Sequence, residues 1–475
     1  MRSISGQIPY ILFLMKTIFR SATHLWLICL SVTIYAQEPG KNSLGDLWEK
    51  VAHNYPGLQA QTALVASTAS KKQAVKSQAL PQFKIQAQNS YGTFEGSNGA
   101  FFPQSGFFNV SGNPTLLDGS DQTFNTFGSA VVEWEVFAFG KQQQENKAAT
   151  AQYQQQIAQK EAYVLQLKKE LAFRHIQHLY ATANYDWMSK NADRLRSIEL
   201  ITNGLAVSGL KPAADNLLAH SSYLQAAGQQ RFWTGSKQAT HIALAELVGE
   251  PLDTLDATRL HHFLTFPLHK TNPSAPIEEL EHPVLAQYKQ EASYFEHSSK
   301  SITRAALPSV KVLGGYAIRG SGIQTNTVTD KWKDGFSNTV DNYLVGVGIT
   351  WNFSSLFTNQ YKKQTLSKQA ESAEKKYSAY EQALQANIEA SQVQIQEQTE
   401  QLQQTHQAIV HATQAYTMYM ARYKSGLITL SELLQIQQLL EQAEKTHIDA
   451  AQQYWMQLVS EATLTANFDF LFTNL

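Results

Sequence analysis

The chain has 475 residues, with Lys+Arg 38 against Asp+Glu 39 and a formal net charge of -1. This balance gives no general attraction to nucleic acid or to membrane surfaces, so nucleic acid is not an expected partner. Charged residues make up only 16% of the chain, which suits surfaces that meet water and also pack against copies of the same chain.

The N-terminal residues have the pattern of a targeting signal. Lys16 and Arg20 precede the apolar run from Leu25 to Ile34, and a small residue, Ala36, follows shortly after. A basic flank, a short apolar core and a small residue before the cleavage point are typical of a secretory signal peptide. We therefore predict a signal peptide over residues 1–36.

Two further features of this segment bear on the mature chain. An apolar patch precedes Met15, so the start of translation stays open between Met1 and Met15. The single cysteine, Cys29, follows Ile28, which is not the small residue that a lipoprotein signal places there, so acylation is not expected. The mature chain then contains no thiol, and we predict neither disulfides nor thiolate chemistry.

The rest of the chain repeats one plan. Proline and tryptophan landmarks recur with offsets of 227 and then 217 residues. The matched pairs are Pro56 with Pro283, Pro81 with Pro308, and Trp134 with Trp351. We predict a first helix–strand–strand–helix–helix repeat over 37–250, a connecting segment over 251–280, and a second repeat with a C-terminal tail over 281–475.

Each repeat contains one very long helix. The stretches from Lys141 to Leu205 and from Asn359 to Lys424 contain no proline, and their apolar residues recur largely at seven-residue intervals. Such spacing favours coiled-coil-like packing, and a helix of this length extends roughly 100 Å. Returning helices are expected over 213–248 and 431–466, the second of them beginning at Ser431.

Four segments alternate between apolar and polar residues, as half-buried strands do. Strands of about ten residues with one apolar face fit a transmembrane barrel, although a soluble sheet with one buried face is the simpler alternative. The signal peptide and the long helices favour the barrel. The residues expected to face lipid are Trp134, Val136, Tyr343, Val345, Val347, Ile349 and Trp351.

Four strands cannot close a barrel, which needs roughly eight or more. An open edge in lipid leaves backbone groups unpaired, so copies of the chain must share one barrel. Two copies supply eight strands with a filled interior, and three supply twelve with room for a passage.

The remaining motifs give no sign of an enzyme. Gly346-Val347-Gly348 lies within a predicted strand and lacks the third glycine of a dinucleotide-binding loop. His175 and His178 share a helical face, but no cysteine or carboxylate pair accompanies them, so packed or solvated histidines are expected rather than a metal site. No catalytic triad or phosphate-binding loop is present, and we predict no cofactor, no metal and no enzymatic activity.

Over its mature length the chain resembles the TolC-like outer-membrane factor (outer membrane efflux protein) family. The resemblance rests on the duplicated order of its landmarks: Asn54-Tyr55-Pro56, His282-Pro283, the segment from Trp134 to Gly140, and Arg422 to Leu427 followed by Ser431 to Leu434. It implies a mainly α fold with a transmembrane β-barrel portion, in which a homotrimer shares a 12-stranded barrel in the outer membrane and a helical tunnel in the periplasm.

The resemblance also implies partners and sites. The hairpin tips of such proteins close the tunnel and meet a periplasmic adaptor, which is coupled to an inner-membrane pump of the RND or ABC type. The expected tip residues are Ser208, Gly209, Leu210, Tyr423, Ser425, Gly426 and Leu427.

Two features depart from the family pattern. Both tips have serine before glycine, and the second long helix has no carboxylate between Gln403 and Lys424. A charged constriction on that helix is therefore in doubt. The candidates for a constriction are Asp193 and Glu199 near the first tip, and Thr417 and Met420 near the second.

These observations predict a channel or exit duct of a tripartite efflux or type I secretion system, located in the outer membrane and extending into the periplasm. Its cargo would be small molecules or polypeptides. The alternative is a structural coiled-coil spacer or adhesin of the envelope, which would have no use for strands with a lipid-suited face.

Overall fold

The computed structural model describes residues 43–93, 122–252, 257–265, 281–324 and 327–475. The predicted signal peptide, including Cys29, and most of the predicted connecting segment lie outside these residues. The chain divides into two compact units. The sheet unit comprises the described residues of Pro56–Leu165 and Ser274–Ile388, and the tip unit those of Met1–Tyr55, Gln166–Pro273 and Glu389–Leu475. Each unit takes elements from both predicted repeats.

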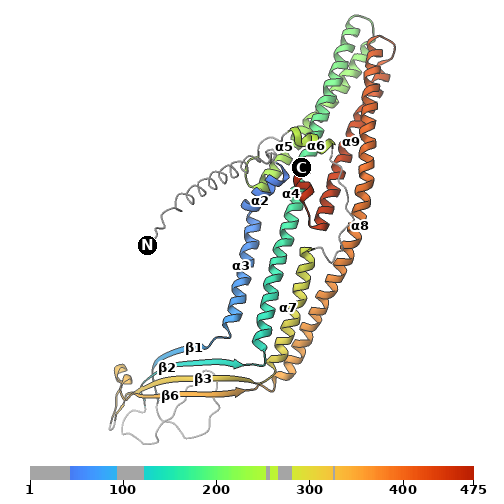
Figure 1. The fold of residues 1–475 in the computed structure, drawn as a ribbon. Helices are drawn as coiled ribbons and strands as arrows, with labels where there is room; N and C mark the ends of the chain where they lie inside the picture. The colour runs from blue at the N-terminus through green and yellow to red at the C-terminus, as the bar shows by residue number, and fades with distance from the viewer. Residues whose placement is uncertain (1–42, 94–121, 253–256, 266–280, 325–326) are drawn as a thin grey trace, which may run out of the picture. The chain divides into compact units, whose positions relative to one another are not determined.

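The sheet unit contains one four-stranded antiparallel sheet and the helices that lead into it (Figure 1). The strands lie in the order β1-β2-β3-β6. Their bounds are β1 Gln82–Thr93, β2 Gln122–Phe137, β3 Ser309–Ser321 and β6 Val340–Thr350. A short hairpin, β4 (Ile323–Gln324) with β5 (Thr327–Val328), and a 3-10 turn, η2 (Trp332–Phe336), follow β3. Two strands thus come from each predicted repeat, as the period-2 segments indicated.

Helices carry the chain to and from this sheet. They are α3 (Pro56–Ser77), the first part of α4 (Lys141–Val207), α7 (Pro283–Ala305) and the first part of α8 (Ser355–Lys424). α4 has 67 residues and α8 has 70, so both stretches without proline form unbroken helices as predicted. Among the described residues, no helix is both long and apolar enough to cross a membrane.

The two repeats adopt the same geometry where helix meets strand. The indole Nε1 of Trp134 donates to the carbonyl of Ala79 at 2.9 Å, and that of Trp351 donates to the carbonyl of Ala306 at 3.1 Å. The predicted last strand is too long, however. β6 ends at Thr350, because the Asn352 side chain accepts the backbone N–H of Ser355 and starts the turn into α8. Trp351 therefore lies just beyond the strand.

The tip unit is helical in its described part. Besides the later parts of α4 and α8 it contains five helices. They are α2 (Leu44–Asn54), α5 (Ala213–Val248), α6 (Ala257–Thr265), α9 (Leu430–Thr465) and α10 (Asp469–Asn474). In the core of this unit the buried Trp455 donates its indole N–H to the carbonyl of Phe263 at 2.9 Å, which ties α6 to α9.

Together these units confirm the predicted fold class of long paired helices with four strands per chain. The trimer stays a prediction, since the structure describes one copy.

Candidate functional site

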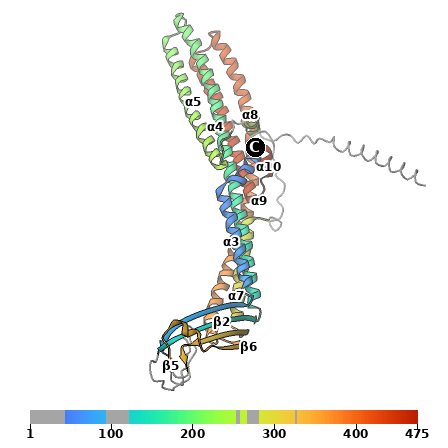
Figure 2. The ribbon, with the colours of Figure 1, turned by 90° about the vertical axis from the view of Figure 1, so that its left-hand side faces the viewer.

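Two helical hairpins end the tip unit, one between α4 and α5 and one between α8 and α9 (Figure 2). Their turns have the same backbone geometry. Gly209 and Gly426 adopt positive φ angles of 72° and 76°. The N–H of Leu210 donates to the carbonyl of Leu205 at 2.9 Å, and that of Leu427 to the carbonyl of Arg422 at 3.0 Å. This is the Schellman arrangement, in which glycine takes the left-handed conformation and a helix ends in a tight reversal.

The serines before the glycines belong to the last helical turns. Ser208 Oγ donates to the carbonyl of Gly204 at 2.8 Å, and Ser425 Oγ donates to the carbonyl of Ala421 at 3.1 Å. Each of these carbonyls also accepts the backbone N–H of the same serine at 3.1 Å, so each hydroxyl adds a second donor to it. The two serines, which depart from the family pattern, thus add hydrogen bonds to the last turns of α4 and α8.

The leucines that follow the glycines are exposed apolar side chains in both turns. Leu210 is 70% exposed and Leu427 is 69% exposed. In many Schellman turns the equivalent side chain packs against the last turn of its own helix. Because both leucines instead point into solvent, each tip presents an apolar side chain that another molecule can cover.

The helices that return from the tips begin differently. Thr429 caps α9 through a capping box, in which its Oγ1 accepts the N–H of Glu432 at 3.3 Å and Glu432 Oε2 accepts the N–H of Thr429 at 2.7 Å. The prediction that Ser431 starts this helix was wrong, because the Thr429–Glu432 spacing forms the box. α5 begins after Pro212, without a side-chain cap.

Tyr423 lies inside the tip unit rather than on its surface. Its side chain is fully buried, and its hydroxyl lies 3.5 Å from Oγ1 of Thr202, which is also fully buried. The contact joins α8 to α4 one turn before the tips. Of the seven residues predicted for the tips, Tyr423 is thus placed to hold two helices together.

The four candidate constriction residues are in separate settings. Asp193 is exposed, whereas Glu199 accepts a hydrogen bond from His220 on α5, with Oε1 and Nδ1 2.6 Å apart. The hydroxyl of Thr417 donates to the carbonyl of Thr413 at 2.9 Å, and Met420 is half-buried. Their role at a constriction stays a prediction.

A polar network between α4 and α9 was not predicted from the sequence. Arg194 forms a bidentate ion pair with Glu444 at 2.9 and 2.5 Å. Further along, the hydroxyl of Tyr180 donates to Asp449 at 2.8 Å, and Lys445 donates to that hydroxyl at 2.9 Å. These partners are more than 240 residues apart in sequence, and no spacing rule connects them.

The sheet has one continuous apolar face. Because side chains alternate along a strand, directly paired residues share a face. The register places Phe83, Val132, Gly314 and Val345 in one row across the four strands. A side chain at Gly314 would meet Val132 Cγ1 at 2.8 Å, so glycine there allows the neighbouring strand its valine.

The predicted lipid-facing residues of the strands lie on or next to this face. Trp134, Val312 and Val347 form a second row, and Tyr343 pairs with Tyr316 in a third. Their exposed fractions in the single chain are high, from 40% at Trp134 to 85% at Tyr343. Val136 and Trp351 lie at the strand ends and are 49% and 53% exposed. The opposite face carries charge, including the ion pair of Glu133 with Lys311 at 2.6 Å.

Among the described residues, the sheet also has two open edges, β1 and β6, each paired on one side only. The backbone donors and acceptors that face outward from an edge strand need partners wherever water is excluded. The sheet therefore combines an apolar face with backbone groups that lack partners at two edges.

The comparisons with known proteins comprise one family model and several solved structures. Residues 280–466 match the family described as outer membrane efflux protein. A search of curated proteins finds no match. The matched part of the chain is therefore similar to the outer membrane efflux protein family, which agrees with the predicted resemblance to TolC-like proteins.

Three solved structures illustrate the likeness of fold. CusC, described in terms of transmembrane channel formation, has 13% identity and a TM-score of 0.72, with 90% of this chain and 93% of that chain covered. The outer membrane protein VceC of Vibrio cholerae has 16% identity and a TM-score of 0.68, with 90% and 97% covered. The open MtrE channel of Neisseria gonorrhoeae has 14% identity and a TM-score of 0.71, with 90% and 89% covered.

The family match confirms the predicted function of an outer-membrane efflux channel that extends into the periplasm. The matched structures are outer-membrane proteins and channels rather than enzymes. None of the comparisons supports the alternative of an envelope spacer or adhesin.

Proposed function

We propose that three copies of this chain form one channel, and that the paired hairpin tips dock on a periplasmic adaptor that works with an inner-membrane pump. The cargo would be small molecules or polypeptides, and the pump would be of the RND or ABC type. The protein itself supplies the passage, and the partner pump supplies the energy.

The sheet with its two open edges carries the proposal of a shared barrel. Each copy contributes four strands. If β1 of one copy pairs with β6 of the next, every edge is satisfied and the apolar faces form one outer surface. A barrel of about eight strands is filled by its own side chains, whereas one of twelve leaves room for solute. The need for an open passage therefore favours three copies over two.

The two tips support the proposal of a docking surface. Their turns share the same hydrogen bonds, and both end in a leucine that is about two-thirds exposed. In three copies the tips would repeat around one ring, which offers an adaptor a regular set of apolar contacts. Aspartate in place of both leucines should therefore remove the apolar contact without altering the turn backbone.

The test is an export assay with the double variant Leu210→Asp/Leu427→Asp and the matched control Leu210→Met/Leu427→Met. We expect the aspartate variant to lose drug tolerance or polypeptide export while its oligomer still assembles in the outer membrane. The methionine variant keeps an apolar side chain and should export normally. Full export by the aspartate variant would rule out docking through the tips.

A further inference from the structure

The helix ends that adjoin the sheet are strongly basic. These ends are the last or first three turns of four helices, residues 67–77, 141–151, 295–305 and 355–365. The basic residues there, called the basic belt below, are Lys71, Lys72, Lys76, Lys141, Lys147, Lys300, Arg304, Lys362 and Lys363. Only Glu145 and Glu296 in the same ranges are acidic. In a chain of net charge -1 this is a local concentration of positive charge.

Most of this charge faces solvent and is not neutralised. Lys300 forms an exposed ion pair with Glu296 at 2.5 Å, and Lys141 lies 3.7 Å from Glu135. Exposed pairs of this kind hold their partners weakly. In the described part of the chain, the structure gives no carboxylate partner to the exposed Lys76. The same holds for Lys71, Lys362 and Lys363.

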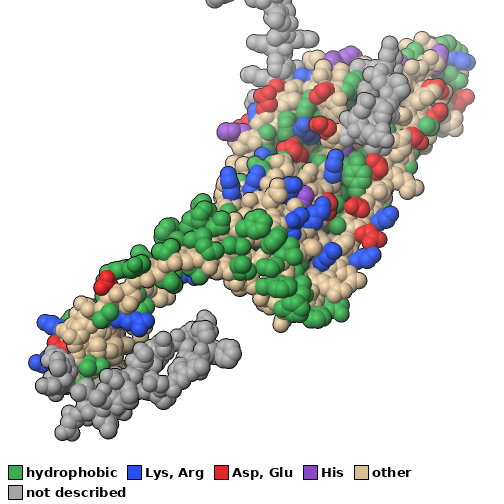
Figure 3. Space-filling model, turned by 60° about the horizontal axis from the view of Figure 1, so that its bottom comes forward, with side chains coloured by type: hydrophobic (Ala, Val, Ile, Leu, Met, Phe, Trp, Pro, Cys, Tyr) green, Lys and Arg blue, Asp and Glu red, His purple; other side chains and the backbone are tan. Residues whose placement is uncertain are grey.

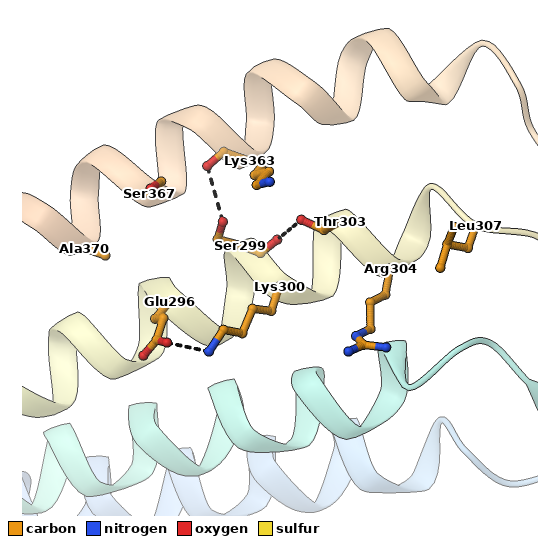
Figure 4. A pocket seen from close by; sticks show the side chains of 9 residues that line it. All are labelled: Glu296, Ser299, Lys300, Thr303, Arg304, Leu307, Lys363, Ser367 and Ala370. Atoms are coloured by element: carbon orange, nitrogen blue, oxygen red, sulfur yellow. Dashed lines mark hydrogen bonds and ion pairs between the residues drawn. The ribbon is translucent and has the colours of Figure 1, made fainter.

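Part of the basic belt lines a cleft between α7 and α8 (Figure 4). The cleft has a volume of about 590 Å³ and contains Lys300, Arg304 and Lys363 together with the apolar Leu307. Lys300 and Arg304 project from one side of α7, and Lys363 projects from α8 (Figure 4). Arg304 uses one N–H on the carbonyl of Phe139 at 2.5 Å, which leaves its other donors available. Glu296 is the one carboxylate that lines the cleft.

Exposed aromatic side chains lie between the basic belt and the strands. Trp351, Phe353, Phe357 and Tyr361 follow one another from the end of β6 into α8 and are 53 to 69% exposed. Lys362 and Lys363 come directly after them. Aromatic rings gather where a membrane meets water, both in barrels and at helix ends. Figure 3 shows apolar side chains along the sheet and basic side chains gathered next to them on the helices.

We propose that the basic belt binds the phosphate groups of anionic phospholipids in the membrane leaflet that faces the periplasm. The proposal rests on the proposed function, because it requires the strands to span the outer membrane. The aromatic residues mark the depth of the headgroups, and the lysines beyond them lie within reach of lipid phosphates. An anionic lipid can contact both the lysines of the basic belt and the exposed aromatic side chains beside them. A free phosphate ion would contact only the lysines.

Binding would be tested on the full mature protein in detergent and in vesicles. Lys300→Gln/Lys363→Gln removes two charges from the basic belt, together with the exposed ion pair of Lys300 with Glu296. Lys169→Gln/Lys375→Gln removes two exposed charges elsewhere and is the matched control. The probes are short-chain phosphatidylglycerol, phosphatidylcholine and inorganic phosphate. Affinity for each is measured by titration at low and at physiological salt.

We expect the wild type and the control to prefer phosphatidylglycerol over phosphatidylcholine, and more strongly at low salt. The belt variant should lose roughly 30-fold in affinity for phosphatidylglycerol, as expected for two lysines at a charged surface. Equal binding of both lipids by the wild type would overturn the proposal, as would an unchanged affinity in the belt variant. Competition by inorganic phosphate alone at the same concentration would indicate a phosphate site and would also overturn it.

Channel conductance separates this inference from the proposed function. In zwitterionic bilayers the belt variant should conduct as the wild type does, because its barrel is unchanged. A wild type that conducts but does not discriminate between the lipids would contradict the lipid site alone. A wild type that does not conduct in any bilayer would contradict the channel itself.

Discussion

Tyr423 lies one turn before an exposed tip, yet its ring is fully buried between α8 and α4. A buried aromatic ring excludes water over a large area, whereas its hydroxyl contact with Thr202, at 3.5 Å, is long for a hydrogen bond. We therefore predict that Tyr423→Ala destabilises the tip unit by about 3–5 kcal/mol and Tyr423→Phe by less than about 1 kcal/mol.

Thermal unfolding of the two variants in detergent measures this difference. Equal losses in both would show that the hydroxyl, rather than the ring, stabilises the helix pair. Loss of neither would contradict the burial of the side chain.

Two buried histidines make the tip unit sensitive to acid. Burial lowers the pKa of His175 to about 3, with a further contribution from the positive charge of His178 when that ring is protonated. Burial also lowers the pKa of His178 to about 4, with smaller contributions from His241 and Lys237. Both values lie below the ordinary histidine pKa of about 6.5. The unfolded chain therefore binds protons that the folded chain does not.

The sign of the pH effect follows from this difference. The stability that the neutral histidines contribute is fully present above about pH 6.5 and is lost as the pH falls toward 4, by up to about 1.4 kcal/mol per pH unit for each group. We expect unfolding experiments between pH 7.5 and 4.5 to give a shallower slope for His175→Leu than for the wild type. His262→Gln, at an exposed position, serves as the control. Parallel slopes for His175→Leu and the wild type would contradict the prediction.

At the scale of elements, α9 has two candidate N-terminal caps, Thr429 and Ser431, which lie two residues apart. Thr429 accepts the N–H of Glu432, whereas Ser431 lies within the first helical turn. Thr429→Ala should lower stability by about 1 kcal/mol, and Ser431→Ala should change it by less than about 0.5 kcal/mol. Denaturant unfolding of the two variants gives the comparison, and a larger loss in Ser431→Ala would reverse the assignment.

The elements of the fold were largely predictable, because each depends on a local pattern. The long helices follow from the absence of proline and from seven-residue spacing, and the turns at Gly209 and Gly426 follow from the need for a residue that tolerates positive φ. The shared face of the four strands follows from period-2 alternation. The wrong predictions concern the ends of elements, where side-chain caps determine which residue is the last or the first. Trp351, for example, lies beyond the end of β6.

Contacts between elements were much less predictable. The Arg194–Glu444 ion pair joins residues 250 apart, and the burial of Tyr423 depends on which helix packs against α8. Neither has a signature within its own segment. The basic belt also forms only when α3, α4, α7 and α8 meet at the same end of the four strands. In sequence its lysines are spread over nearly 300 residues.

At the scale of the whole molecule, a single copy of the chain has surfaces that lack partners. Within the residues that the structure describes, its sheet has an apolar face and two unpaired edges, and its tips carry leucines that nothing covers. Both features are resolved if several copies join edge to edge in the membrane and meet a partner at the tips. The long helices alone would suit a spacer, but a spacer gives no reason for the sheet.

The most direct test of this account is single-channel recording on the mature protein reconstituted into planar bilayers, combined with the native mass of the same oligomer in detergent. A barrel shared by three copies should give discrete conductance steps from a species of three times the mass of the mature chain. A monomer that stays in solution without detergent and adds no conductance to the bilayer would contradict it.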